Sequence, residues 1–371
     1  MNMKVRCDRI ELAECLGDVL GIVPASQAQK PIFLDFHLKT EDARLTVEAT
    51  DLEMAARISL ERVEVLDTGE VALPALRLSS LIREIPDKTV YIEALDGGRG
   101  ATVRAEGYEF KLLGEDPAEF PQVPAFSQEK AFSVPREKFV ESLRRVGIAA
   151  CRDLARYQLN GVFFEVEGEK LTLTATDGKR LTHDYIRIEN PNKIEANAIV
   201  PNRVVDVLLK VLAQGDPTVS LVVGDPDVQA SFGRGQVTAK VIQGRFPDYK
   251  VALPTKVNVR ATAKKQDFLV AARTAALMTN KETATVSFKF TPDKAYLSTQ
   301  ATDIGESRIE LPLTLEGESL EMRFNPTYFI DALRCLTEDE VRLEFLNAER
   351  PVALRSGQHY RHFVMPIVTA K

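Results

Sequence analysis

The run Thr176-Asp177-Gly178-Lys179-Arg180 contains the residue types needed for two kinds of chemistry. An aspartate at the end of a strand can act as a nucleophile or as a metal ligand, and the two cations that follow it can bind phosphate. This pattern raises the hypothesis of a metal- or phosphate-dependent hydrolase that uses Asp177. Other features of the chain favour a structural role for the same aspartate.

The sequence Ala-Thr-Asp occurs three times, each time after an alternating apolar run that is typical of a strand. The aspartates are Asp51, Asp177 and Asp303, spaced by 126 residues, and the Phe-Pro pairs at Phe120 and Phe246 have the same spacing. Catalysis rarely needs one acid on three separate domains, whereas an aspartate that caps a turn explains all three copies. The repeat predicts three copies of one domain, over residues 1–128, 129–255 and 256–371.

Each copy divides again into two helices and antiparallel strands, which predicts an α+β fold. Proline opens several amphipathic runs, where its missing N–H and its fixed φ suit the first helical turn. Segments with a period of two and many β-branched residues predict strands, among them residues 162–166, 218–223, 285–290 and 341–345. Six helices are predicted, beginning near Asp8, Pro74, Pro135, Pro201, Lys264 and Pro326.

Composition favours a soluble, cytoplasmic protein. The first residues are rich in charge, and no apolar run approaches the roughly 20 residues of a membrane span, so no membrane partner is expected. The cysteines are scattered and the four histidines complete no ligand cluster, so we expect reduced cysteines, no metal and no cofactor. The net charge of −6 argues against a domain that binds DNA tightly along a basic surface.

One predicted helix nevertheless concentrates positive charge. If it spans residues 136–156, an apolar stripe and a basic stripe lie on different faces. An ordinary solvated helix face is the alternative interpretation. The apolar stripe contains Phe139, Leu143, Val146 and Ala150, and the basic stripe contains Lys138, Arg145, Arg152 and Arg156.

Several motifs, spread over the whole chain in order, resemble the bacterial DNA sliding clamp, the beta subunit of DNA polymerase III. They are Thr50 to Met54, Tyr157 to Glu165, Ala175 to Leu181, Arg245 to Tyr249 with Leu253-Pro254, Phe324-Asn325 with Tyr328, and Val364-Met365-Pro366. The resemblance implies a non-enzymatic processivity factor that forms a ring, as a head-to-tail homodimer, around duplex DNA. Its implied partners are the replicative DNA polymerase, the clamp loader, and other polymerases and repair proteins that carry a clamp-binding peptide.

Helix geometry supports two chains for each ring. Six helices at about 10 Å spacing leave roughly 9 Å clear, too little for a duplex about 20 Å wide, whereas twelve leave roughly 28 Å. A closed ring also needs little phosphate affinity, so only its lining should be basic. The candidates that face DNA are Lys138, Arg145, Arg152, Arg156, Lys210, Lys264, Lys265 and Arg273, with Arg77 and Arg83 as further candidates.

The resemblance also implies a dimer interface and a peptide-binding pocket. The interface would have Phe110, Leu277 and Met278 at its apolar centre. For the apolar members of the pocket, plain core packing is the alternative interpretation. The pocket would contain Leu159, Thr176, Gly178, Lys179, Arg180, Leu181, Pro247, Asn325, Tyr328, Pro351, Val364, Met365 and Pro366.

Three departures from the family pattern leave the preferred peptide open. Lys250-Val251-Ala252 replaces a more basic run, Thr283 stands where an aromatic residue is common, and the chain continues past Pro366 with Ile-Val-Thr-Ala-Lys. The sequence is also compatible with a specialised paralogue of the clamp.

Overall fold

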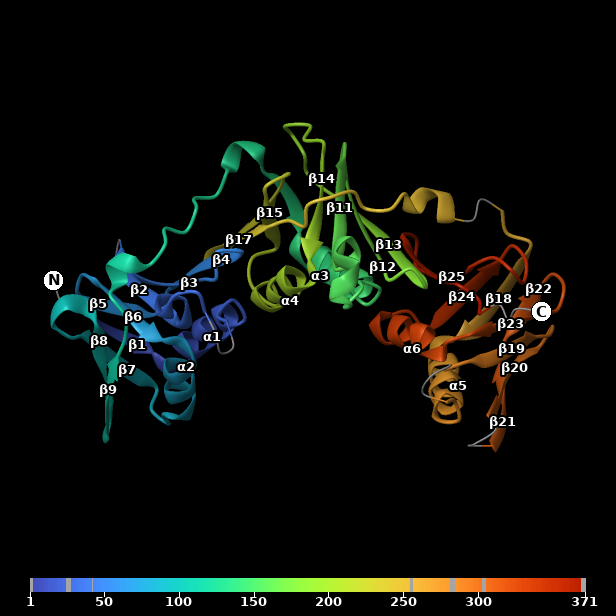
Figure 1. Cartoon of the computed structure of the whole chain (residues 1–371), viewed down its shortest axis with the longest axis horizontal. Coiled ribbons are helices and arrows are strands. Elements are labelled where there is room, and N and C mark those ends of the chain that lie inside the picture. The colour runs from blue at the N-terminus through green and yellow to red at the C-terminus, as the bar shows by residue number, and fades with distance from the viewer. Residues whose placement is uncertain are drawn as a thin grey trace. The chain divides into compact units, whose positions relative to one another are not determined.

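In the part of the chain that the structure describes, six α-helices begin at or within a residue or two of the positions that the sequence predicts (Figure 1). This computed structural model describes residues 3–24, 28–41, 43–253, 256–280, 284–301 and 305–367. Thr283, Asp303 and the last residues, 368–371, lie outside these ranges. The helices are α1 (Arg9–Leu20), α2 (Ala75–Glu84), α3 (Arg136–Gly147), α4 (Asn202–Val211), α5 (Lys265–Leu277) and α6 (Pro326–Cys335).

Side-chain caps and prolines set where these helices start. Asp8 accepts a hydrogen bond of 2.9 Å from the Glu11 N–H at the start of α1. Asn325 accepts one of the same length from the Thr327 N–H at the start of α6, where Pro326 occupies the first turn. Each cap satisfies a backbone donor that has no partner inside the helix. Pro74 and Pro201 instead end a strand and precede their helices by one residue.

The chain divides into two compact units, Met1–Val140 with Ile188–Val241, and Glu141–Arg187 with Ile242–Lys371. We call them unit 1 and unit 2 and describe each by itself. The division passes through α3 and separates parts of the central third of the chain. The domain boundaries at 128 and 255 therefore remain predictions.

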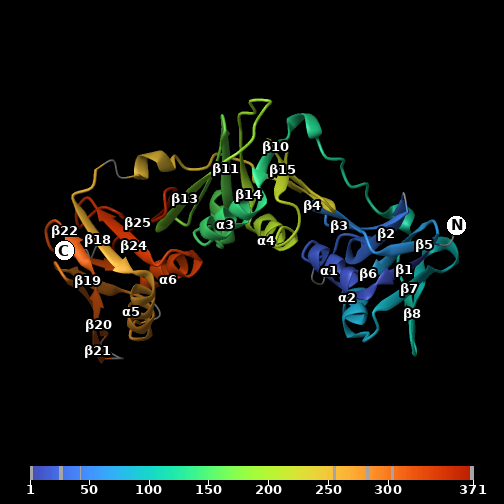
Figure 2. The same cartoon turned by 180° about the vertical axis from the view of Figure 1, so that it is seen from behind.

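Unit 1 contains two antiparallel sheets, with strand orders β5-β1-β7-β8-β9 and β10-β15-β16-β17-β4-β3-β2-β6. Helices α1 and α2 pack against each other, and α1 packs on β3 and β4 (Figure 2). The strands are β1 (Lys4–Asp8), β2 (Asp35–Glu41), β3 (Arg44–Thr50), β4 (Met54–Leu60), β5 (Val63–Asp67), β6 (Glu70–Pro74), β7 (Thr89–Ala94), β8 (Gly100–Ala105), β9 (Tyr108–Leu113), β10 (Phe132–Pro135), β14 (Ala196–Pro201), β15 (Thr218–Val223), β16 (Asp227–Phe232) and β17 (Gly235–Lys240).

In unit 2, the strands β11-β12-β13-β26-β25-β24-β18-β22 follow one another in a hydrogen-bonded sheet, and β21-β20-β19-β23 form a second sheet. The strands are β11 (Gly161–Glu167), β12 (Lys170–Thr176), β13 (Arg180–Arg187), β18 (Val259–Lys264), β19 (Val286–Phe290), β20 (Lys294–Ala301), β21 (Gly305–Pro312), β22 (Thr314–Glu316), β23 (Leu320–Phe324), β24 (Glu340–Phe345), β25 (Val352–Ser356) and β26 (Tyr360–Val364).

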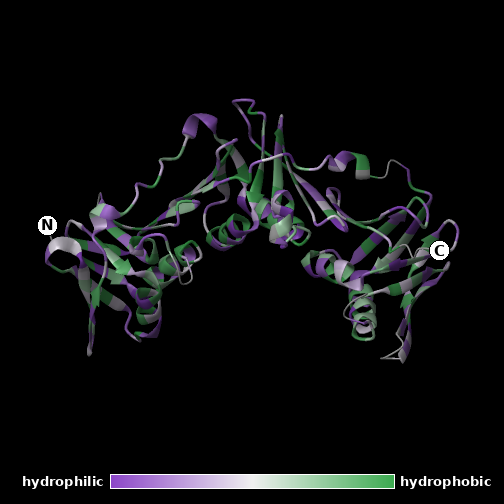
Figure 3. Ribbon diagram, in the orientation of Figure 1, coloured by the Kyte–Doolittle hydropathy of each residue, from purple (hydrophilic) through white to green (hydrophobic). Residues whose placement is uncertain are grey.

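An aromatic cluster joins α5 and α6 to the sheets of unit 2. Phe268 of α5 and Phe329 of α6 have ring centroids 5.4 Å apart, and both rings pack against Phe288 of β19. All three side chains are fully buried. Along the strands, apolar and polar residues alternate as predicted, so that one face packs on the helices (Figure 3).

The helix at residues 136–156 is shorter than predicted, which corrects the basic stripe. Helix α3 ends at Gly147, and Arg152 lies beyond it. Arg145 is on the helix but is only 8% exposed, so it is not available to a phosphate. Its guanidinium lies 2.6 Å from Glu141 and 3.6 Å from Glu338, and 5.7 Å from the ring of Tyr360. Arg145 is therefore a structural cation that ties α3 to the segment after α6.

We expect Arg145→Ala to lower the free energy of unfolding by about 1 to 3 kcal/mol, because it removes a buried cation whose two carboxylate partners, Glu141 and Glu338, are partly exposed. The neighbouring Arg144 is exposed, so Arg144→Ala serves as a control with the same loss of charge. Urea unfolding of both variants measures the difference. Equal stability of the two variants would show that the buried ion pairs contribute nothing.

Candidate functional site

Unit 2 contains a mostly apolar cavity of about 230 Å³. We call it the apolar pocket. Its walls come from the end of the 3₁₀ helix η5 (Leu154–Leu159), the turn between β12 and β13, the segment around η6 (Tyr249–Ala252), and the end of β26. It is lined by Leu159, Thr176, Gly178, Arg180, Leu181, Pro247, Asp248, Tyr249, Leu253, Pro351, Phe363 and Met365.

Pairing of β13 with β26 brings the two halves of the apolar pocket together. Leu181 pairs with Phe363, and the Met365 N–H donates to the Lys179 carbonyl at 2.9 Å. Successive side chains of a strand point to opposite faces, so Phe363 and Met365 share the face that lines the pocket. Val364 points the other way and is fully buried in the core of unit 2, so its prediction as a pocket residue is wrong.

The Thr-Asp turn forms the rim of the apolar pocket. Asp177 Oδ1 accepts hydrogen bonds of 2.9 Å from the N–H groups of Lys179 and Arg180. Gly178 has φ +85°, which favours glycine there. In unit 1, Asp51 accepts in the same way from the Glu53 and Met54 N–H groups, so the predicted turn-capping role is confirmed in both copies that the structure describes.

Arg180 connects this turn to α6. Its Nε lies 3.1 Å from Asp177 Oδ2 and its Nη1 lies 2.7 Å from Asp331 Oδ2. Its guanidinium also lies 4.8 Å from the centroid of the Tyr328 ring. Two carboxylates and an aromatic face thus hold the Arg180 side chain in one orientation. The Nε and Nη1 groups of Arg180 therefore bond within the protein, whereas the sequence analysis expected the Arg180 side chain to bind a peptide.

The remaining predicted pocket residues lie around the apolar pocket without lining it. Lys179 is exposed on the turn, and Asn325 is the N-cap of α6. Tyr328 supports Arg180, and Pro366 follows Met365 at the edge. Sequence reasoning missed the contributions of Asp248, Tyr249, Leu253 and Phe363. The first three belong to a motif that the sequence analysis had recognised, and the period of two along β26 would have indicated Phe363 in place of Val364.

Of the basic candidates, several have structural partners. Arg156 is on η5, and its Nη1 donates to the Asp177 carbonyl at 2.9 Å, so it belongs to the rim of the apolar pocket. In unit 1, Lys210 donates to the Gly17 carbonyl at the end of α1. Lys265 donates to the Leu336 carbonyl at 3.0 Å. Lys265 is partly buried, and the exposed candidates are Arg77, Arg83, Lys138, Arg152, Arg156, Lys210, Lys264 and Arg273.

The predicted interface residues are partly exposed at sheet and helix ends. Phe110 lies on β9, an edge strand of its sheet, and its ring is 6.3 Å from that of Tyr108. Leu277, the last residue of α5, is 79% exposed, an unusual exposure for a large apolar side chain. Met278 follows it and is partly buried.

Two histidines of unit 2 are held neutral by burial. His362 is fully buried, and its Nδ1 lies 2.7 Å from Thr182 Oγ1 across the β13–β26 pair. Burial lowers the pKa of His362 to about 3, and the charge of Arg180 acts in the same direction. Burial also lowers the pKa of His183 to about 4. Both therefore remain uncharged at neutral pH.

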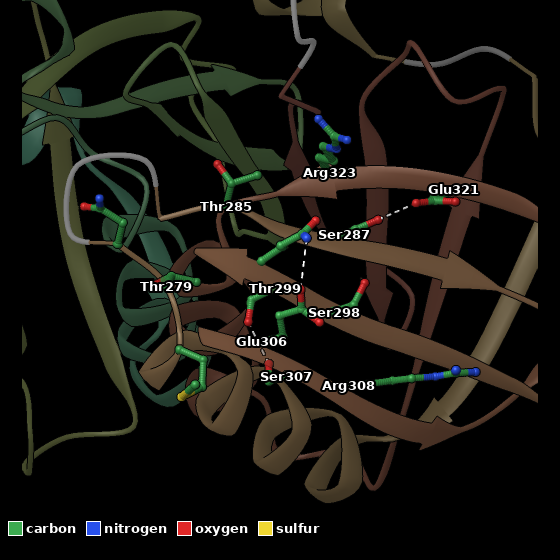
Figure 4. A pocket seen from close by; sticks show the side chains of 13 residues that line it. Thr279, Thr285, Ser287, Ser298, Thr299, Glu306, Ser307, Arg308, Glu321 and Arg323 are labelled. Carbon is green, nitrogen blue, oxygen red and sulfur yellow. Dashed lines mark hydrogen bonds between the residues drawn. The ribbon is translucent and has the colours of Figure 1, made fainter. Parts of the chain in front are cut away.

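A larger cavity, of about 870 Å³, lies at the β19–β20–β21–β23 sheet and is lined by polar side chains (Figure 4). Its residues bond to one another: Ser287 donates to Glu321 at 2.7 Å, and Gln300 donates to Glu306 at 3.0 Å. Because these polar groups already bond to one another, fewer of them are available to a ligand than the mostly apolar lining of the apolar pocket offers to an apolar side chain. In the described part of the chain, no group of three His, Cys, Asp or Glu residues is placed to hold a metal ion. No helix in the described ranges is both long and apolar enough to cross a membrane.

Models of the DNA polymerase III beta subunit match the chain from end to end. The N-terminal domain matches residues 3–124, the central domain 133–248 and the C-terminal domain 250–368. The beta sliding clamp of Streptomyces coelicolor is 30% identical over 380 aligned positions, which cover 98% of this chain and 99% of the relative. The beta sliding clamp of Escherichia coli K12 is 28% identical and is covered completely, again over 98% of this chain.

Solved structures share the fold. The DNA polymerase sliding clamp of Bacillus subtilis superposes with a TM-score of 0.92 at 24% identity, over 100% of both chains. The DNA polymerase III beta subunit of Thermotoga maritima gives 0.91 at 24% identity, over 99% of this chain and 100% of the other.

The buried histidines predict acid sensitivity. In the unfolded chain a histidine takes up a proton near pH 6.5, whereas His362 does so only near pH 3 when folded. Below pH 6.5 the unfolded chain binds a proton that the folded chain does not bind, so the free energy of unfolding falls as the pH falls. The loss is about 1.4 kcal/mol per pH unit for each such histidine. We expect His362→Asn, which can keep the Thr182 contact, to show a shallower loss of unfolding free energy between pH 6.5 and 4. Identical slopes would contradict the assignment.

Proposed function

The chain belongs to the beta sliding clamp family, the beta subunit of bacterial DNA polymerase III, and from this premise we propose that two copies close head to tail around duplex DNA and tether the proteins that act on it. The role is that of a non-catalytic accessory subunit in the cytoplasm. Its partners are the replicative polymerase, the clamp loader, and other polymerases and repair proteins that carry a clamp-binding peptide.

The observation that carries the tethering role is the apolar pocket. It is mostly apolar, yet it opens at a rim of polar groups that includes Arg180 and the Thr176 turn. A cavity of about 230 Å³ suits a few apolar side chains of an extended peptide rather than a whole folded partner. Leu181 and Phe363 are buried lining residues and Met365 is a lining residue that is 45% exposed, so a leucine or phenylalanine of the peptide would find apolar contacts there.

The proposal of a ring is supported by apolar side chains near the ends of a helix and a sheet, and by sheet edges that could pair with a second copy. Strands β9 and β21 are each the edge of a sheet, with backbone groups available for pairing. Leu277 and Phe110 supply apolar side chains next to these elements, and two partners that bury them would be joined by both sheet pairing and apolar contact. Met278 continues the same surface.

The DNA-facing role is proposed for the exposed cations. Lys138, Lys264 and Arg273 lie on or at the start of helices, and Arg152 follows α3. A chain with net charge −6 would hold DNA by enclosure, with a few cations guiding it and a largely acidic exterior. A hydrolase based on Asp177 is not favoured, because its Oδ1 and Oδ2 are engaged by the turn and by Arg180.

We expect the double variant Leu253→Ala and Met365→Ala to weaken peptide binding by about tenfold to a hundredfold, because each change removes apolar contact area. The probe is a short fluorescein-labelled peptide whose only large apolar residues are leucine and phenylalanine, measured by fluorescence polarisation. Val251→Ala is the matched control, since Val251 is 81% exposed and does not line the apolar pocket. A double variant with unchanged affinity would place the peptide elsewhere.

The ring predicts retention on circular DNA. After loading, the protein should remain on nicked circular DNA and be lost on linearisation, as gel filtration of the DNA-bound fraction would measure. Leu277→Asp should give monomers by sedimentation and abolish retention, because it places a charge in the proposed interface. Val270→Asp, at a half-exposed position on the same helix, is the control. Retention that survives linearisation, or a Leu277→Asp dimer, would rule out the ring as described.

A further inference from the structure

Glu165 lies beside the apolar pocket without lining it. It is on β11, and its side chain is 18% exposed. Its Oε2 accepts a hydrogen bond of 3.0 Å from the Tyr249 hydroxyl, and its Oε1 accepts one of 3.1 Å from Lys250 Nζ. One carboxylate on the sheet thus holds two consecutive residues of η6.

Tyr249 is a wall of the apolar pocket and is only 6% exposed. Its ring packs 5.5 Å from His183 and edge-on to Phe246, which stacks on Phe163 at 4.9 Å. Burial raises the pKa of the Tyr249 phenol, with the nearby Glu165 adding to the effect, so the hydroxyl remains protonated and donates. The hydrogen bond to Glu165 is therefore present throughout the physiological pH range.

The segment that carries this wall is not a strand of the sheet. Residues 246–253 form a loop and the 3₁₀ helix η6, and the Leu253 N–H bonds back to the Lys250 carbonyl within the same segment. Pro247 and Asp248 are exposed. Side-chain contacts of Phe246 and Tyr249 thus fasten the segment to β11–β13. The Tyr249 hydroxyl adds directional polar contacts to Glu165 and Thr174, and these are less exposed than the contact of Lys250 Nζ with Glu165.

We propose that Glu165 is a positioning residue of the peptide site, which fixes the pocket wall formed by Pro247, Tyr249 and Leu253 by holding the Tyr249 hydroxyl. This inference rests on the proposed function of the apolar pocket. Without the contact, the segment can shift away from β13 and widen the cavity, and a leucine or phenylalanine side chain then loses contact on one side. Glu165 therefore acts on affinity although it does not touch the peptide.

A double-mutant cycle tests the path through Tyr249. The four proteins are the parent, Glu165→Ala, Tyr249→Phe and the double variant, measured with the fluorescein-labelled leucine- and phenylalanine-containing peptide. Each single change should weaken binding about fivefold to tenfold, and the loss in the double variant should be smaller than the product of the two single losses, since both changes remove the Glu165–Tyr249 hydrogen bond while Tyr249→Phe also removes a hydrogen bond with Thr174. Fully additive losses would overturn the proposal.

Two further variants separate positioning from a general loss of charge or stability. Glu165→Gln keeps an oxygen that accepts from Tyr249 and should retain most of the affinity. Glu167→Ala removes a carboxylate from the same strand, where the side chain is 62% exposed, and should bind within twofold of the parent. If Glu165→Gln binds as weakly as Glu165→Ala, or if Glu167→Ala is equally weak, the inference is wrong.

The same measurements distinguish this inference from the function on which it rests. If the parent shows no saturable binding of the peptide, the proposed function fails, and the inference fails with it. If the parent binds and Glu165→Ala binds equally well, only the inference fails. If Glu165→Ala melts at a much lower temperature than the parent, the other two variants decide. Weak peptide binding by Tyr249→Phe together with retained binding by Glu165→Gln supports the proposal. Any other combination overturns it.

Discussion

The register of β26 against β13 is the constraint on which the candidate site depends. Leu181 opposite Phe363 places residues far apart in the chain on one surface, and the bond from the Met365 N–H to the Lys179 carbonyl extends the pairing past the end of the strand. A slip of one residue would turn Phe363 and Met365 into the core and Val364 outward. The buried contact between Thr182 and His362 stabilises the observed register, because an alternative pairing would leave these polar groups without partners.

Charged side chains add a second set of connections to the same sheet. Arg180 joins the Thr-Asp turn to Asp331 of α6, and Arg145 joins α3 to Glu338. Both arginines are largely buried, so each needs its carboxylates to offset the loss of hydration. The rim of the apolar pocket is consequently part of the framework of unit 2. A site built this way is held in shape before any partner binds, which lowers the entropy lost on binding.

Counts of charged residues give conflicting predictions about DNA binding by this protein. The net charge of −6 disfavours a DNA-binding role, while a helix with several arginines favours one. The structure gives several of the candidate cations backbone or carboxylate acceptors, among them Arg145 on α3, Arg156 on η5 and Lys210 on α4. In the proposed ring, weak contacts from exposed cations such as Lys138 and Arg273 would be compatible with sliding along DNA.

The sequence by itself determined the local structure and the repeat. Helix starts, strand alternation and the Thr-Asp turns depend on neighbouring residues, and the family resemblance named most of the residues that line the pocket, Leu159 and Pro351 among them. Tertiary structure decided which side chains line it: Val364 is buried and Phe363 exposed to the cavity because of the strand register, and Tyr249 forms a wall because Glu165, on a distant strand, holds it. It also decided that Arg145 is a core cation, since α3 stops at Gly147 and packs on Tyr360. These outcomes depend on contacts between residues remote in sequence. Local periodicity groups Phe363 with Met365 on one face of β26, but it does not say which face lines a pocket.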